Sequence, residues 1–199
     1  MPCINNYTEI RSLLDPVTPD DFYHLQLIQR KKDNPLLGLN SRVIKSYYID
    51  SMEYFDKIKN EVINICNHNN ARACINLNKK SYEKVAHRAL VNMSNLMSIK
   101  EYRYASKVYN RAVDQTTHQG LYKRWVVDID VNDEFHANSM WSYIVGLQKN
   151  VFENYQPIAL LPSKSGFHII SNPFDTTKFR EKYPMVDIHK NSPTNLYIP

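Results

Sequence analysis

The 199-residue chain lacks the features of a secreted, membrane-spanning or disulfide-rich protein. Its three cysteines, Cys3, Cys66 and Cys74, form no CxxC pair, which argues against a disulfide framework and against a structural zinc site. No apolar run approaches the ~18 residues that a membrane-spanning helix needs. Residues 1–14 lack the basic stretch and apolar core of a signal peptide. We therefore expect a soluble, intracellular, cytoplasmic protein with no membrane partner.

Glycine is also scarce, with 4 residues, whereas 43% of the chain is hydrophobic and 12% is aromatic. This composition excludes collagen-like and disordered chains, because enough apolar surface is present to offset the entropy of ordering. The length predicts one domain over 22–199, preceded by a loosely attached entry segment over 1–21. Within that domain we distinguish a helical and α/β part (22–120) from a second part (121–199).

Hydrophobic patterning predicts an α+β fold with a mixed sheet that helices cover on one face. Ser51 is expected to cap one helix, and Asn132 or Asp133 another. Residues 22–35 are predicted to form a strand followed by a basic turn, and further strands are predicted over 42–49, 71–78, 123–131, 155–162, 166–171 and 185–190. The predicted helices are 52–66, 79–97, 100–113, 133–147 and 177–184.

The strand over 123–131 carries Asp128 and Asp130, two carboxylates at alternate positions. Alternate side chains share one face of a strand, so these two lie together, opposite the apolar residues. Like charges so placed are costly unless a cation bridges them, and a pair of Mg²⁺ or Mn²⁺ ions is the usual reason for such a pattern. An exposed edge strand with solvated aspartates is the other interpretation.

The segment SKSGFH forms a turn that leads into the strand 166–171, and it gathers groups that bind anions. Lys164, Ser165 and the backbone amide of Gly166 are free to contact a phosphate, and His168 projects from the strand. A histidine flanked by apolar residues can equally be a structural residue. Asp187, in MVDIHK, again alternates with apolar residues, and Lys190 follows it.

Taken together, the three segments match what nucleotidyl transfer requires. Carboxylates hold two metal ions that activate a hydroxyl and stabilise the leaving pyrophosphate, while His, Ser and Lys neutralise the triphosphate. The charge distribution agrees, since basic residues outnumber acidic ones five to one over 22–49, five to one over 72–88 and four to one over 100–111. Basic flanks around an acidic centre are typical of a nucleic-acid enzyme.

WVVDIDV, SKSGFH and MVDIHK, in this order, resemble the three motifs of the archaeo-eukaryotic primase (primase-polymerase) superfamily, in its phage and mobile-element forms. The resemblance implies that Asp128, Asp130 and Asp187 are metal ligands and that His168 contacts the incoming triphosphate. ARACINLNKKS resembles the strand on which family members place an arginine near nucleotide or template, here Arg72.

The same resemblance implies further properties. The fold would be an RRM-like sheet with an added N-terminal α/β unit. The partners would be a DNA template or primer, nucleoside triphosphates, and a helicase or C-terminal domain. The family pattern is Ser-x-His, whereas Ser165 lies three residues before His168 and Gly166 occupies the position of the family's serine, so either the Ser165 hydroxyl or the Gly166 amide would contact the phosphates. Because the chain ends just after the last motif, we expect a fragment or a minimal protein.

The sequence thus predicts a metal-dependent DNA primase or polymerase. Two other classes stay open at this point. One is a non-catalytic module that binds single-stranded nucleic acid, and the other is a metal-dependent nuclease or replication-initiator domain. The sequence contains no His-hydrophobic-His pair, which argues against the nicking form of the latter.

Overall fold

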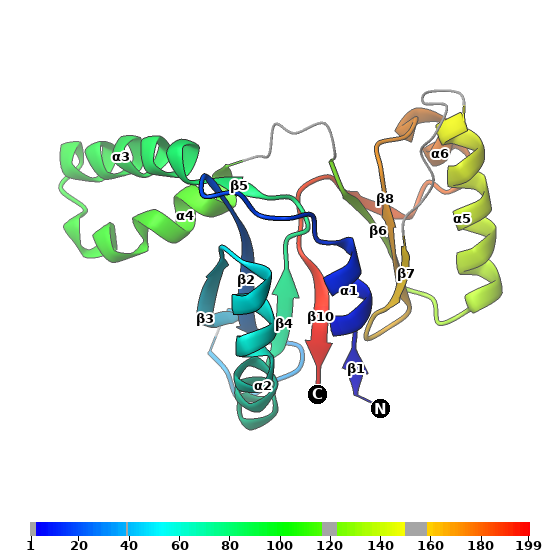
Figure 1. Ribbon diagram of the computed structural model, residues 1–199, viewed down its shortest axis with the longest axis horizontal. Coiled ribbons are helices and arrows are strands. Elements are labelled where there is room, and N and C mark those ends of the chain that lie inside the picture. The colour runs from blue at the N-terminus through cyan, green and yellow to red at the C-terminus, as the bar shows by residue number, and fades with distance from the viewer. Residues whose placement is uncertain (1–2, 39, 117–122, 150–158) are drawn as a thin grey trace.

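The computed structural model describes residues 3–38, 40–116, 123–149 and 159–199, and it confirms the α+β class. The strands form two sheets (Figure 1), and every described pair of strands is antiparallel. The mixed sheet that we expected is not formed. The strands Arg42–Ile49 and Arg72–Ile75 run parallel to each other, but they do not pair, because the strand Asp21–Gln29 lies between them and is antiparallel to both.

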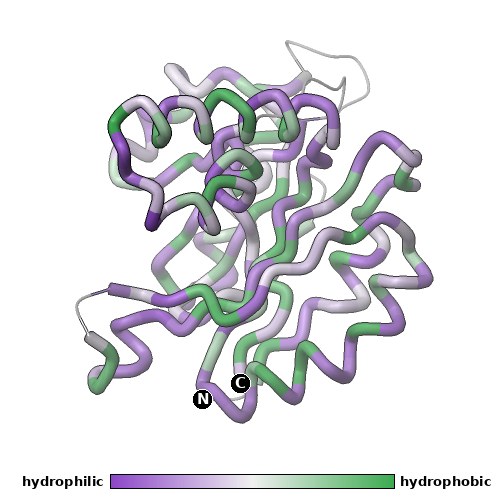
Figure 2. Tube along the Cα trace, turned by 90° about the vertical axis from the view of Figure 1, so that its left-hand side faces the viewer, coloured by the Kyte–Doolittle hydropathy of each residue, from purple (hydrophilic) through white to green (hydrophobic). Residues whose placement is uncertain are grey.

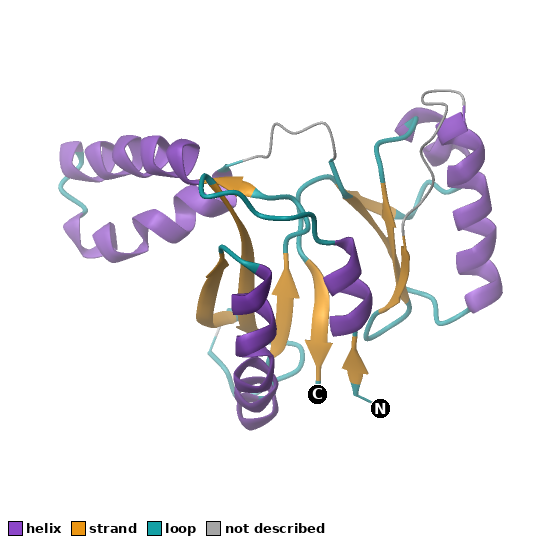
Figure 3. Ribbon diagram, viewed as in Figure 1, coloured by secondary structure: helices purple, strands orange, loops and turns teal. Residues whose placement is uncertain are grey.

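The first sheet has the order β1-β10-β4-β2-β3, and β5 pairs with one end of β2. Its strands are β1 (Ile4–Asn5), β2 (Asp21–Gln29), β3 (Arg42–Ile49), β4 (Arg72–Ile75), β5 (Lys80–Ser81) and β10 (Thr194–Ile198). Figure 3 shows two helices lying against one face of this sheet, α1 (Tyr7–Leu13) and α2 (Met52–Asn69). Helix α2 begins where the sequence predicts, because the Ser51 side chain accepts a hydrogen bond from the Tyr54 amide.

The second sheet has the order β7-β8-β6-β9. Its strands are β6 (Trp125–Ile129), β7 (Ala159–Pro162), β8 (Phe167–Ser171) and β9 (Asp187–His189). Its outer face is covered by α5 (Glu134–Lys149) and α6 (Thr176–Lys182), which lie on the far side from the first sheet in Figure 3. Asp133, rather than Asn132, caps α5, since its Oδ1 accepts hydrogen bonds from the Phe135 and His136 amides. The part of the predicted strand over 155–158 lies outside the described residues.

The chain between β5 and β6 forms a helical arm that extends from the first sheet (Figure 1). It consists of α3 (Tyr82–Ser98), the 3₁₀ helix η1 (Tyr102–Lys107) and α4 (Val108–Gln115). The sequence predicts one α-helix over 100–113, but the first part is 3₁₀ and only the second is α-helical. The predicted strand over 71–78 is also shorter, because β4 ends at Ile75 and the chain turns into β5.

The entry segment is not loosely attached as predicted. Tyr7 and Ile10 on α1 are buried in the same core as α2, and β1 pairs with β10. The Asn6 side-chain amide donates to the carbonyl oxygens of Asn195 and Pro162, so this segment touches both sheets. Strand β10, which the sequence patterning misses, lies between β1 and β4 near the centre of the first sheet.

The two sheets share one apolar core. Val126, Leu161 and Ile170 of the second sheet pack in the same cluster as the residues that α1 and α2 bury against the first sheet. Trp125, Val127 and Ile129 point the other way, into a separate cluster beneath α5 and α6. Alternation along β6 therefore turns Asp128 toward the first sheet.

Candidate active site

Three of the sequence-predicted residues form one row across the second sheet. Asp128 on β6 is paired in register with His168 on β8 and with Asp187 on β9. Directly opposite residues of antiparallel strands lie on one face with Cβ atoms ~4.5–5.5 Å apart. The row thus joins one residue from each of the three predicted motifs.

His168 occupies the centre of a hydrogen-bonded chain. Its Nε2 lies 3.3 Å from Asp128 Oδ1, and its Nδ1 lies 2.8 Å from Thr194 Oγ1. A carboxylate only accepts hydrogen bonds, so Nε2 carries the proton in this contact. Because Thr194 is the first residue of β10, the imidazole links the second sheet to the first.

Asp128 has a cationic environment although it is part of an acidic pattern. The hydrogen bond from His168 lowers the pKa of the Asp128 carboxyl, and this outweighs the effect of partial burial. His189 and Lys32 lower it further. Lys32 comes from the connection between β2 and β3, and sequence reasoning counted it only as part of a basic turn. The Asp128 side chain keeps 30% of its surface exposed, so the carboxylate remains open to a ligand.

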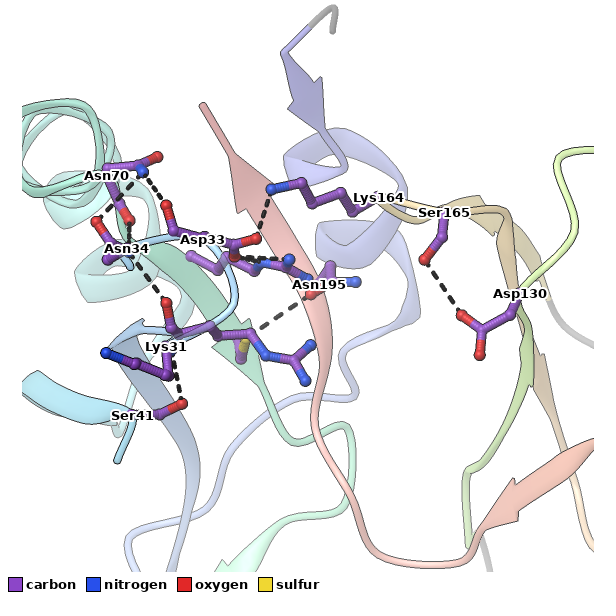
Figure 4. Close-up of polar contacts among 12 residues, drawn as sticks. Lys31, Asp33, Asn34, Ser41, Asn70, Asp130, Lys164, Ser165 and Asn195 are labelled. Carbon is purple, nitrogen blue, oxygen red and sulfur yellow. Dashed lines mark hydrogen bonds and ion pairs between the residues drawn. The ribbon is translucent and has the colours of Figure 1, made fainter. Parts of the chain in front are cut away.

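Asp130 and Asp187 are both exposed, but they differ in their contacts. The Ser165 hydroxyl donates a 3.2 Å hydrogen bond to Asp130 Oδ1, as Figure 4 shows. Within the described residues, no three His, Cys, Asp or Glu side chains lie together as a group that could hold a metal ion. The structure thus brings Asp187 beside Asp128, on the side away from His168, and directs Asp130 to the serine of the turn.

Gly166 lies in the turn at a point where no side chain fits. A Cβ atom on Gly166 would collide with the Ile129 carbonyl oxygen and would lie 2.8 Å from the carbonyl oxygen of Val131. The turn therefore packs directly on the backbone that leaves β6, and only glycine fits there. The turn is closed by the Ser163 amide, which donates to the Gly166 carbonyl oxygen at 2.8 Å.

Lys164 and Arg72, both predicted to contact nucleotide or template, converge on a residue that the sequence analysis did not select. Asp33 accepts from Lys164 Nζ at 2.5 Å and from Arg72 Nε at 2.7 Å (Figure 4). Burial raises the pKa of the Asp33 carboxyl, but the hydrogen bonds from Lys164 and Arg72 outweigh it and lower that pKa overall. The only sequence signal was a lone carboxylate after three basic residues, RKKD.

Arg72 and Lys190 lie apart from the row. The Arg72 side chain is buried beneath Asp33, with only 4% of its surface exposed. Lys190 is exposed, and its Nζ lies 4.7 Å from the ring centroid of Trp125. Trp125 belongs to the cluster on the opposite face of β6, so Lys190 lies on the side away from Asp128.

A second polar cluster, which sequence reasoning missed, surrounds the buried Lys80. Its Nζ donates to the Thr116 carbonyl oxygen at 2.6 Å and to Asn191 Oδ1 at 3.3 Å. Burial lowers the pKa of the Lys80 ammonium to about 8. Burial, and then the charge of Lys80, lower the pKa of the neighbouring His24 to about 4, so His24 is neutral at pH 7. His24, Lys80 and Asn191 line a cavity of about 240 Å³.

No family model, curated protein or solved structure matches the chain. Among the described residues, no helix has the length and apolar character needed to cross a bilayer.

Proposed function

We propose that the protein is a metal-dependent nucleotidyltransferase, a DNA primase or polymerase that joins nucleotides on a DNA template. The observation that carries the proposal is the row Asp128, His168 and Asp187, paired in register on three adjacent strands. Residues from three motifs that are 19 to 59 positions apart in the sequence lie on one face of one sheet. The resemblance of these motifs to those of primase-polymerases supports the same reaction class.

The donor set suits Mg²⁺ or Mn²⁺. Asp128 and Asp187 lie directly opposite each other and repel, and His168 lies on the other side of Asp128, on β8. Carboxylate oxygens are the ligands these ions prefer, so Asp128, Asp187 and Asp130 would hold them. When bound, two ions would lower the pKa of the attacking hydroxyl and stabilise the charge on the leaving pyrophosphate.

The remaining residues of the site would bind and orient the triphosphate. The Nε2–H of His168, which donates to Asp128, would be shared with a phosphate oxygen, and the Thr194 hydroxyl fixes the ring through Nδ1. Lys164, Ser165 and the Gly166 amide lie on the adjacent turn, and Lys32 adds a positive charge from the first sheet. On this proposal the protein acts in the cytoplasm of a cell that carries a phage or mobile element.

Nucleotide incorporation tests the proposal. Protein is incubated with Mn²⁺ or Mg²⁺, labelled nucleotides and either a primed or a bare template. We expect incorporation that Asp128→Asn or Asp187→Asn reduces by more than about 100-fold. Asp56→Asn, which removes an exposed carboxylate on α2, should leave activity unchanged. No incorporation by the wild-type chain with either metal, or equal activity of Asp128→Asn, would refute the proposal.

A non-catalytic module that binds single-stranded nucleic acid is the second candidate. It is favoured by the hydrogen bond between Ser165 and Asp130, because this contact engages one of the three carboxylates expected to hold metal. This candidate predicts binding that neither EDTA nor the Asp128→Asn substitution changes, without incorporation under any condition.

A further inference from the structure

The largest cavity described lies between β3 and the helical arm, away from the candidate active site. It is an open groove of about 1070 Å³. One wall is β3, and the other is formed by α3, η1 and α4. Figure 2 turns the arm toward the viewer and shows hydrophilic and hydrophobic residues alternating along it. The arm exposes several large apolar side chains, namely Leu90, Val91, Met97, Ile99, Tyr102, Tyr104 and Tyr109.

The groove is positively charged. Its lining contains four basic residues, Arg42, Lys45, Lys107 and Arg111, and one acidic residue, Asp114. Lys45 is neutralised by Glu61, whose carboxylate lies 2.5 Å from its Nζ. Among the described residues, Arg42, Lys107 and Arg111 have no ion pair; Arg42 donates to the neutral amide oxygen of Gln29. Three cations are therefore available for a polyanion.

Aromatic rings accompany these cations. Tyr104 is 43% exposed in the wall formed by the arm, with the guanidinium of Arg103 4.9 Å from its ring centroid. Tyr48 lies in the wall formed by β3, where it meets Tyr109 edge to face at 5.4 Å and stacks on His24 with ring planes 5° apart. Alternating rings and cations in a groove are what unpaired bases and phosphates require.

The groove adjoins a second cavity. Asp114 lines both the groove and the smaller cavity of about 240 Å³ around Lys80. Asn191, two residues beyond β9, the strand that carries Asp187, also lines this smaller cavity.

We propose that this groove binds single-stranded nucleic acid. Arg42, Lys107 and Arg111 contact phosphates, and a base stacks on Tyr104. An unpaired strand is favoured over a duplex because the bases of a duplex are already stacked on each other. It is favoured over an acidic peptide because a base offers a flat surface that stacks on the exposed ring of Tyr104, and acidic side chains do not. The assignment of this strand as the template rests on the proposed function, whereas the binding itself does not.

Fluorescence anisotropy with a labelled 20-nucleotide oligothymidine tests the groove, without nucleotides or divalent metal. Lys107→Ala/Arg111→Ala should weaken binding by about tenfold or more at 0.1 M salt and flatten the slope of log K against log salt by about 1.4. Tyr104→Ala should weaken it by about tenfold, and Tyr104→Phe should leave it unchanged because the ring is kept. Lys57→Ala/Arg180→Ala, which removes two exposed cations from α2 and α6, is the charge-matched control and should change affinity less than twofold.

Three outcomes would each overturn the proposal that the groove binds single-stranded nucleic acid. They are no binding by the wild-type chain, equal losses of affinity in the groove and control variants, and tighter binding of a duplex of the same length. The outcome is separable from that of nucleotide incorporation. Incorporation with unaltered binding in the groove variants would refute the groove alone. Groove-dependent binding without incorporation would refute the enzyme alone.

Discussion

At the scale of single residues, Gly166 determines the geometry of the turn beside the row of Asp128, His168 and Asp187. It is buried against the backbone of residues 129–131, so the turn cannot accept a side chain there without moving away from β6. Ser165 reaches Asp130 and Lys164 reaches Asp33 from the same turn. The position of both contacts therefore depends on a residue that has no functional group.

Substituting this glycine should be costly. Gly166→Ala is expected to lower the free energy of unfolding by about 3 kcal/mol, because the added Cβ meets backbone atoms that cannot rotate aside. Gly146→Ala in α5 is the matched control, with no heavy atom within 4 Å of the added Cβ, and should raise stability by about 0.5–1 kcal/mol. Urea denaturation followed by circular dichroism measures both, and a fully stable Gly166→Ala would show that the turn packs differently.

His24 should make the stability of the protein depend on pH. Its pKa is lowered to about 4 in the folded chain, against 6.5 for the unperturbed group, so the unfolded chain binds more protons between these values. Stability should therefore fall, by up to about 3 kcal/mol, as the pH drops from 6.5 to 4. The His24→Gln variant should have a flatter slope of unfolding free energy in this window. An identical slope in the two proteins would mean that His24 titrates normally.

At the scale of elements, Asp33 joins three segments that are distant in the sequence. It lies on the connection between β2 and β3, and it pairs with Arg72 on β4 and with Lys164 on the turn between β7 and β8. The last contact links the two sheets. The ion pair between Asp33 and Arg72 is buried, since the Arg72 side chain is 4% exposed and the Asp33 side chain is 7% exposed.

Removing this carboxylate should destabilise the protein strongly. Asp33→Ala is expected to cost about 3 kcal/mol, because it leaves the buried Arg72 guanidinium without its counterion. Asp56→Ala, which breaks the exposed pair with Arg11, should cost less than about 1 kcal/mol. Since the folded pKa of Asp33 is lowered, its contribution should be lost as the pH falls below about 4, and Asp33→Ala should lack that part of the acid transition. Equal costs for the two variants in thermal melts would contradict this.

Local signals allowed much of the element order to be predicted from the sequence. The cap at Ser51, the cap at Asp133 and the β-branched run over 42–49 each act within a few residues, and the structure confirms all three. Strand β10 was missed and the entry segment was wrongly predicted to be loose, because β10 pairs with β1 and β4 and because Tyr7 and Ile10 pack in a core built from distant parts of the chain.

The candidate site, like the fold, was predicted from the sequence only where local patterns determine it. Alternation placed Asp128, His168 and Asp187 on strands, and the register then brought them into one row. The contacts of His168 with Thr194, and of Asp33 with Lys164, connect the two sheets and depend on how the sheets pack. No short-range pattern encodes that packing, so these partners could not be predicted.

At the scale of the whole molecule, two sheets share one core and a basic arm projects beyond it. The row lies on the face of the second sheet that is turned toward the first, and the groove of the arm adjoins the cavity around Lys80. Helix α3 buries only Val85 among its residues, whereas α4 buries Val108, Ala112 and Val113. Helix α4 therefore anchors the arm, and most of the surface of α3 is left available for a partner.

The most direct test of the central claim is a crystal structure of the protein with Mn²⁺ and a non-hydrolysable nucleoside triphosphate. We predict anomalous density for manganese in direct contact with the carboxylates of Asp128 and Asp187, and a phosphate oxygen within hydrogen-bonding distance of His168 Nε2. Manganese and nucleotide bound elsewhere, with His168 still paired to Asp128 and no density at the row, would contradict the account.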